Sequence, residues 1–129
     1  MKKLLLILLC LPFIGFGQQT YIPDDNFEAY LETNGMGNGI PNDDFVFTAN
    51  IDTITYLNLD GPQGNGMQIS DLTGIKDFTA LEYLRCGENL ITNLDVSNLS
   101  SLKELHCQSG WLNSITSLNI NGATSLEYL

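Results

Sequence analysis

Basic side chains are scarce in this sequence, and this scarcity narrows the range of partners. Lys and Arg make up 5 of the 129 residues, against 15 Asp and Glu, so the formal net charge is −10. A surface with such an excess of negative charge repels the phosphates of nucleic acids and anionic lipid surfaces. We therefore expect no nucleic-acid partner, and solubility is a sufficient reason for the acidity.

Side chains suited to catalysis and metal binding are also few. The chain has one histidine, His106, and no G-x-S-x-G, H-E-x-x-H or phosphate-binding glycine motif. The acidic pairs at residues 24–25 and 43–44 fit a helix start and a loop better than a hydrolytic pair. We expect no enzyme activity, no cofactor and no metal site. Calcium binding by residues 34–44 stays open, because this loop is rich in oxygen ligands but lacks the EF-hand spacing.

A long apolar run occurs only once, at the N-terminus. Two lysines precede an almost wholly apolar stretch over residues 4–16, and the small residues Gly15 and Gly17 precede Gln18. This order is typical of a secretory signal peptide, and the stretch is too short to span a membrane. We predict cleavage after Gly17, which leaves a net charge of about −12 because both lysines are lost. No membrane insertion is expected after cleavage.

The rest of the chain repeats itself. The pattern L-x-x-L at residues 81–84 recurs at residues 102–105 and again at residues 126–129. Residues 89–96 match residues 113–120 in the same order. Self-similarity at a spacing of about 20 to 25 residues indicates a repeat architecture.

A looser copy of the repeat precedes these blocks, over residues 56–75. From Ile69 on, apolar residues recur at every third position: Ile69, Leu72, Ile75, Phe78, Leu81 and Leu84. Neither a strand, with period 2, nor an α-helix, with period 3.6, has this spacing. It is the spacing of a tight coil whose side chains return to one interior.

These blocks resemble the bacterial leucine-rich repeat, L-x-x-L-x-[L/C]-x-x-N-x-[L/I]-x-x-L, and residues 94–97 resemble segments of internalin-like secreted surface proteins. The resemblance implies a leucine-rich-repeat solenoid of the α/β horseshoe type. Such a fold has a short parallel β-sheet on one face, a mostly irregular opposite side and a small N-terminal helical cap. The first copy departs from the pattern, because Met67 stands where later copies have Asn89 and Asn113. The resemblance further implies a bacterial protein that is secreted or on the cell surface.

Three regions follow from these observations: a signal peptide over residues 1–17, a cap over residues 18–52 and repeats over residues 53–129. The cap is expected to hold a helix at about residues 23–33, then a loop and an edge strand. Phe27, Tyr30 and Leu31 fall on one face of this helix, and Phe45, Phe47 and Ile51 fit an edge strand that runs into the first coil. We expect the natural chain to continue past Leu129, since the sequence stops within a repeat.

Residues at matched inward positions are expected to be structural. Asn89 and Asn113 fit a buried ladder whose amides satisfy backbone groups where the chain turns away from the strand. The alternative is a surface polar residue or a glycan acceptor. Cys86 and Cys107 fit core thiols, with a disulfide as the alternative. Trp111, in the insertion between the last two matched blocks, is either a core plug or an exposed anchor.

The exposed face of the predicted sheet is the best candidate for a binding site. Alternate residues of each strand point outward, which predicts two columns of side chains. The first column is Tyr56, Tyr83, Glu104 and Tyr128, and the second is Asn58, Arg85 and His106. Tyr and Arg are enriched in binding hot spots, although Tyr also favours strands. We expect a protein-interaction or adhesion module; the alternatives are the recognition arm of a larger secreted enzyme and a carbohydrate-binding module.

Overall fold

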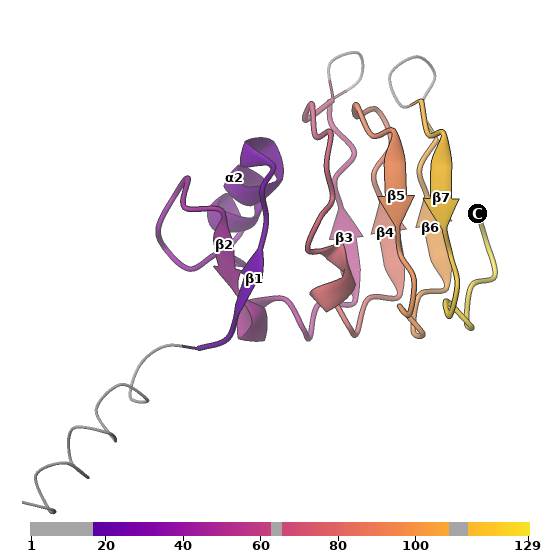
Figure 1. Ribbon diagram of the computed structural model, residues 1–129, viewed down its shortest axis with the longest axis horizontal. Coiled ribbons are helices and arrows are strands. Elements are labelled where there is room, and N and C mark those ends of the chain that lie inside the picture. Colours follow the sequence, from indigo (N-terminus) through magenta and orange to yellow (C-terminus); the bar gives the residue numbers. More distant parts are fainter. Residues whose placement is uncertain (1–16, 63–65, 109–113) are drawn as a thin grey trace, which may run out of the picture.

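The computed structural model describes residues 17–62, 66–108 and 114–129. The predicted signal peptide, apart from Gly17, lies outside these residues, and so do Trp111 and Asn113. The described chain forms a cap followed by a stack of coils (Figure 1). Within these ranges, no helix is long and apolar enough to cross a membrane.

A two-stranded sheet forms one part of the cap. Strand β1 (Gln19–Tyr21) pairs antiparallel with β2 (Phe45–Phe47), and a 3₁₀ turn, η2 (Thr48–Asn50), follows. Phe45 and Phe47 of the expected edge strand lie in β2, where Val46 is the buried residue and Phe45 is exposed. The sequence analysis did not identify β1, which pairs with β2. This pairing sets which face of β2 points inward.

One helix, α2 (Asp25–Thr33), forms the rest of the cap. It begins two residues later than expected, because the Asp24 carboxylate accepts hydrogen bonds from the N–H groups of the first turn. Phe27 and Leu31 are fully buried, as their spacing of four residues on one helix face requires. The helix ends before Gly35, whose φ of 74° is left-handed and suits glycine.

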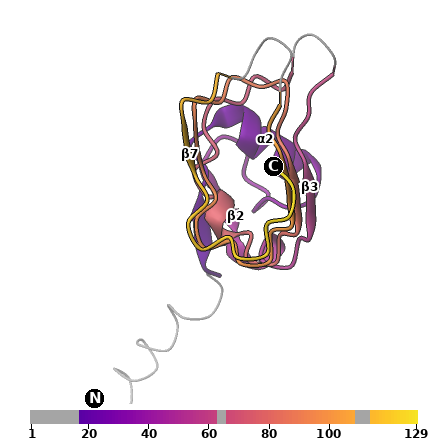
Figure 2. The same ribbon diagram turned by 90° about the vertical axis from the view of Figure 1, so that its right-hand side faces the viewer.

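Parallel strands form the first face of the stacked coils. Strands β3 (Tyr56–Asn58), β4 (Tyr83–Arg85) and β6 (Glu104–His106) form one sheet in that order. The central residue of each strand, Leu57, Leu84 or Leu105, is buried, and its neighbours point outward. The coils overlie one another when the molecule is viewed along the stack (Figure 2).

The opposite side of the coils is more regular than we predicted. Strands β5 (Asn93–Asp95) and β7 (Ser117–Asn119) pair in parallel and form a second sheet, where a mostly irregular segment was expected. Leu94 and Val96 alternate with polar residues and are buried, so this segment has the period of a strand. In the first coil, the same side carries a 3₁₀ turn instead, η3 (Ile75–Asp77).

The apolar core runs from the cap into the coils and thins out in the last one. All six residues of the three-residue period are buried: Ile69, Leu72, Ile75, Phe78, Leu81 and Leu84. Phe27 of the cap stacks on Phe78 of the first coil, with ring centroids 6.3 Å apart, so cap and coils share one core. In the last coil, Leu118, Ile120 and Leu129 are exposed.

Asn89 is buried and bonded to backbone on all sides. Its Nδ2 donates to the carbonyl oxygens of Leu59 at 2.9 Å and Gly87 at 3.0 Å. Its Oδ1 accepts a hydrogen bond from the N–H of Ile69 at 3.2 Å. The amide therefore ties its own turn to the preceding coil, which is the structural role predicted for it.

Candidate functional site

The two predicted columns of outward side chains lie on the sheet of β3, β4 and β6. Tyr56, Tyr83 and Glu104 are register partners in successive strands, and a parallel bridge adds Tyr128 to Glu104. Tyr56 and Tyr128 are the most open, with 55% and 61% of their surface exposed. The rings of Tyr56 and Tyr83 are 6.4 Å apart and tilted by 47°. Aromatic surface is thus concentrated along one column.

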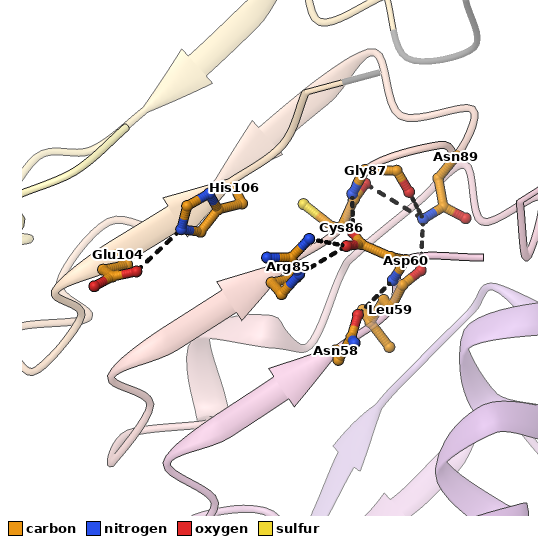
Figure 3. Close-up of polar contacts among 9 residues, drawn as sticks. All are labelled: Asn58, Leu59, Asp60, Arg85, Cys86, Gly87, Asn89, Glu104 and His106. Atoms are coloured by element: carbon orange, nitrogen blue, oxygen red, sulfur yellow. Dashed lines mark hydrogen bonds and ion pairs between the residues drawn. The ribbon is translucent and has the colours of Figure 1, made fainter. Parts of the chain in front are cut away.

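The second column combines Asn58, Arg85 and His106, which the register also places side by side. Asp60, just after β3, accepts a 2.7 Å hydrogen bond from Arg85 Nε and another at 2.7 Å from the N–H of Gly87 (Figure 3). The guanidinium is therefore held in a defined position on the sheet. The sequence analysis missed Asp60, although an acidic residue one coil away from an arginine was a usable signal.

Two further side-chain pairs lie on this face: a lysine–glutamate ion pair and a histidine–glutamate contact. Lys103 Nζ lies 2.7 Å from Glu82 Oε2, and His106 Nε2 lies 3.0 Å from Glu104 Oε2. The hydrogen bond that Lys103 Nζ donates to the Glu82 carboxylate is the main reason why the pKa of Lys103 is raised. These side chains are partly exposed, so the pairs contribute little to stability and mainly set the orientation of the groups.

Two thiols lie behind the second column. Cys86 and Cys107 follow the matched strands β4 and β6, and the N–H of Cys86 donates to the His106 carbonyl oxygen at 2.8 Å. The structure holds both as thiols rather than as the alternative disulfide. Burial, the Cys107 thiol and the Asp60 carboxylate raise the pKa of Cys86 to about 12, and burial raises the pKa of Cys107. Both thiols are therefore protonated at neutral pH.

Stability should fall at alkaline pH because of Cys86. Its folded-state pKa of about 12 exceeds the value of 9.0 for an unburied thiol. The buried thiol thus stabilises the fold fully below pH 9, and this contribution is lost as pH rises towards 12, by up to about 1.4 kcal/mol per pH unit. Urea melts under reducing conditions at several pH values should show a steeper decline for the natural protein than for Cys86→Ala. Equal slopes would contradict the assignment.

The acidic side chains of the cap hold its own loop. Glu28, only 1% exposed, accepts a 3.1 Å hydrogen bond from the N–H of Asp43, and Glu32 accepts one from Asn38 at 2.7 Å. Asp43 in turn accepts from the Asn38 amide at 2.9 Å. These carboxylates therefore accept hydrogen bonds from N–H groups of residues 34–44. Across the described ranges, His, Cys, Asp and Glu form no group of three or more suited to a metal ion.

A groove that the sequence analysis did not predict lies on the opposite sheet. The groove has a volume of about 620 Å³ and runs from β1 across η3 to β5 and β7. Its floor consists of outward residues of the second sheet, which we had expected to be irregular. Polar residues that alternate with Leu94 and Val96 are the sequence signal for this floor. The signal becomes meaningful only when residues 93–95 are recognised as a strand.

The stacked parallel strands with inward leucines define a fold of the leucine-rich-repeat type. Among solved structures, the chain is similar to the functional domain of InlJ from Listeria monocytogenes, with a TM-score of 0.67 and 32% sequence identity. The match covers 90% of this chain and 24% of that chain. That domain includes a cysteine ladder, and Cys86 and Cys107 occupy adjacent coils here. No protein-family model and no curated protein matches the chain.

Proposed function

We propose that this chain is a non-enzymatic binding module of an exported bacterial surface protein. It binds a protein ligand through the outer face of β3, β4 and β6. The observation that carries the proposal is the register of the two columns, which gathers three tyrosines and an arginine fixed by Asp60 on one exposed face. Aromatic and arginine side chains that are already held in place lose little freedom on binding and are favoured as interface anchors.

Two further observations support the proposal. One solved structure that resembles this chain is the functional domain of InlJ from Listeria monocytogenes, and the repeat coils resemble those of internalin-like secreted surface proteins. The order of charged, apolar and small residues in residues 1–17 supports export. On this proposal the coils belong to a curved solenoid of the horseshoe type, whose repeated strands supply an extended binding surface.

A protein ligand is favoured over a glycan by the arrangement of the tyrosines. A stacking platform for sugar rings needs flat aromatic faces that are open to solvent. The Tyr56 and Tyr83 rings are instead tilted by 47° to each other, and Tyr83 is half-buried. The charged groups around them also suit a partner whose surface carries both charges, such as a protein.

Binding should depend on the centre of this face. We expect the double variant Tyr83→Ser with Arg85→Ser to lose at least about tenfold in affinity. A tenfold loss corresponds to about 1.4 kcal/mol, and truncation of a single hot-spot residue can cost that much. The measurement is biolayer interferometry of the mature chain against purified cell-surface and extracellular-matrix proteins. Urea melts should show that the variant is folded.

The exposed Ser100, on a turn away from this face, provides the control. Ser100→Ala should bind like the natural protein. A protein ligand whose affinity is the same for both variants would contradict the proposal. Binding on a glycan array that depends on Tyr83, without any protein ligand, would favour the carbohydrate alternative instead.

A further inference from the structure

The outer face of the β5–β7 sheet is exposed and bounded on one side by the cap, which makes it a groove rather than a flat surface. The volume of about 620 Å³ lies within the range of ligand-binding sites, about 300 to 1,000 Å³. Strands β5 and β7 lie in front of β4 and β6 in Figure 1, on the opposite side of the coils from the proposed ligand face. The groove is therefore separate from the two columns described above.

Two rows of polar side chains form the floor of the groove. The parallel register places Asn93 beside Ser117 and Asp95 beside Asn119. Asp71 extends the first row into the first coil, where it also lines the groove. Amides, hydroxyls and carboxylates that alternate along strands offer hydrogen-bond partners at the spacing of an extended chain.

The wall of the groove is held in place by the cap. Thr20 of β1, only 2% exposed, donates a 2.7 Å hydrogen bond to Asp77 Oδ2 in η3. Gly74, with a φ of 99°, allows β1 to approach closely, because a Cβ there would collide with Ile22 and lie 2.6 Å from the Tyr21 carbonyl oxygen. The groove is therefore formed before any ligand arrives, which lowers the cost of binding.

The charge of the groove is negative, and one aromatic ring lies at its rim. Asp71, Asp77 and Asp95 line it, and Lys76 is the one basic residue among the lining side chains that the structure describes. Lys76 Nζ lies 3.5 Å from Asp95 Oδ2, and both side chains are half exposed, so Asp95 stays open to a second cation and the lining keeps a net charge of −2. Tyr21, half exposed at the edge, presents a ring that attracts cations.

We propose that this groove binds an extended peptide segment that bears lysine or arginine side chains. The backbone of the segment hydrogen-bonds to the rows of the floor, its cations meet Asp71 and Asp95, and one cation stacks on Tyr21. Charge complementarity favours this occupant. A neutral sugar offers no cation to the excess carboxylates, and a second copy of this acidic chain is repelled. The inference stands whether or not the opposite face binds a protein.

The test uses a short synthetic peptide of alternating Lys and Thr, titrated into the mature chain and followed by calorimetry. We expect binding that weakens at least tenfold in Asp71→Asn with Asp95→Asn. The charge-matched control, Asp25→Asn with Glu127→Gln, alters exposed acids outside the groove and should stay within about twofold. Tyr21→Ser should weaken binding several-fold through loss of the ring. Urea melts verify that each variant is folded.

Three results would overturn the inference. Equal weakening in the two double variants would mean attraction to the whole acidic chain rather than to the groove. Binding of a glutamate–threonine peptide with the same affinity would remove the charge argument. Displacement of the lysine peptide by a neutral oligosaccharide such as maltohexaose would identify a sugar site instead. The double variant Tyr83→Ser with Arg85→Ser should bind the peptide normally, which separates this site from the proposed ligand face.

Discussion

Asn89→Ala is expected to lower the free energy of unfolding by about 3 kcal/mol, because each buried backbone group left unpaired costs about 1 to 3 kcal/mol. The Asn89 side chain is fully buried and bonds the carbonyl oxygens of Leu59 and Gly87 and the N–H of Ile69. Alanine leaves these groups without a partner and too deep for water to reach them easily. Urea melts followed by circular dichroism measure the loss.

The control must be an asparagine without a buried amide. Asn98 is exposed, but its φ of 65° is left-handed, so alanine there adds backbone strain of about 1 kcal/mol or more. Asn98→Gly avoids the strain and should change stability by less than about 1 kcal/mol. If Asn89→Ala and Asn98→Gly are equally mild, Asn89 does not join the coils.

Asp24→Ala should be the other strongly destabilising change, at about 2 to 4 kcal/mol, because it removes a helix cap and a buried carboxylate acceptor together. Asp24 Oδ1 accepts from the N–H groups of Asn26 and Phe27 at 3.1 and 3.0 Å. Its Oδ2 accepts from the N–H and Oγ of Ser70 and from the N–H of Asp71, at 2.9 to 3.1 Å. One side chain therefore both starts α2 and fastens the cap to the first coil.

The neighbouring acid provides a matched control. Asp25 is exposed in the first turn of the helix, so Asp25→Ala loses only its interaction with the helix dipole, about 0.3 to 1 kcal/mol. Hydrogen exchange on Asp24→Ala should show faster exchange in α2 and in the first coil together. Faster exchange in α2 alone would mean that the carboxylate acts only as a helix cap.

The pattern of the repeats predicted the main sheet well, since apolar periodicity reports directly which side chains face inward. Tyr56, Tyr83 and Glu104 were assigned to one column from the spacing of the leucines, and they are register partners in the structure. The role of this column in binding stays a prediction. The amide of Asn89 was likewise predicted from its place after the strand.

The sequence was less informative about contacts between segments that are far apart. The hydrogen bonds from Ser70 to Asp24 join residues 46 positions apart, and the one from Thr20 to Asp77 spans 57 positions. Nothing in the local pattern of Thr20 or Asp24 distinguishes these partners from solvent. For the same reason β1 and its antiparallel pairing with β2 were missed.

By itself, the sequence determined the coil: its period, the inward positions and the excess of negative charge. These follow from the order of residue types along the chain, because burial of apolar side chains and repulsion between charges need no knowledge of distant partners. The tertiary structure alone decided how the cap joins the coils at Asp24 and Gly74, and that a second sheet faces a preformed groove. Those features depend on which backbones approach one another, and that is settled only when the coils stack.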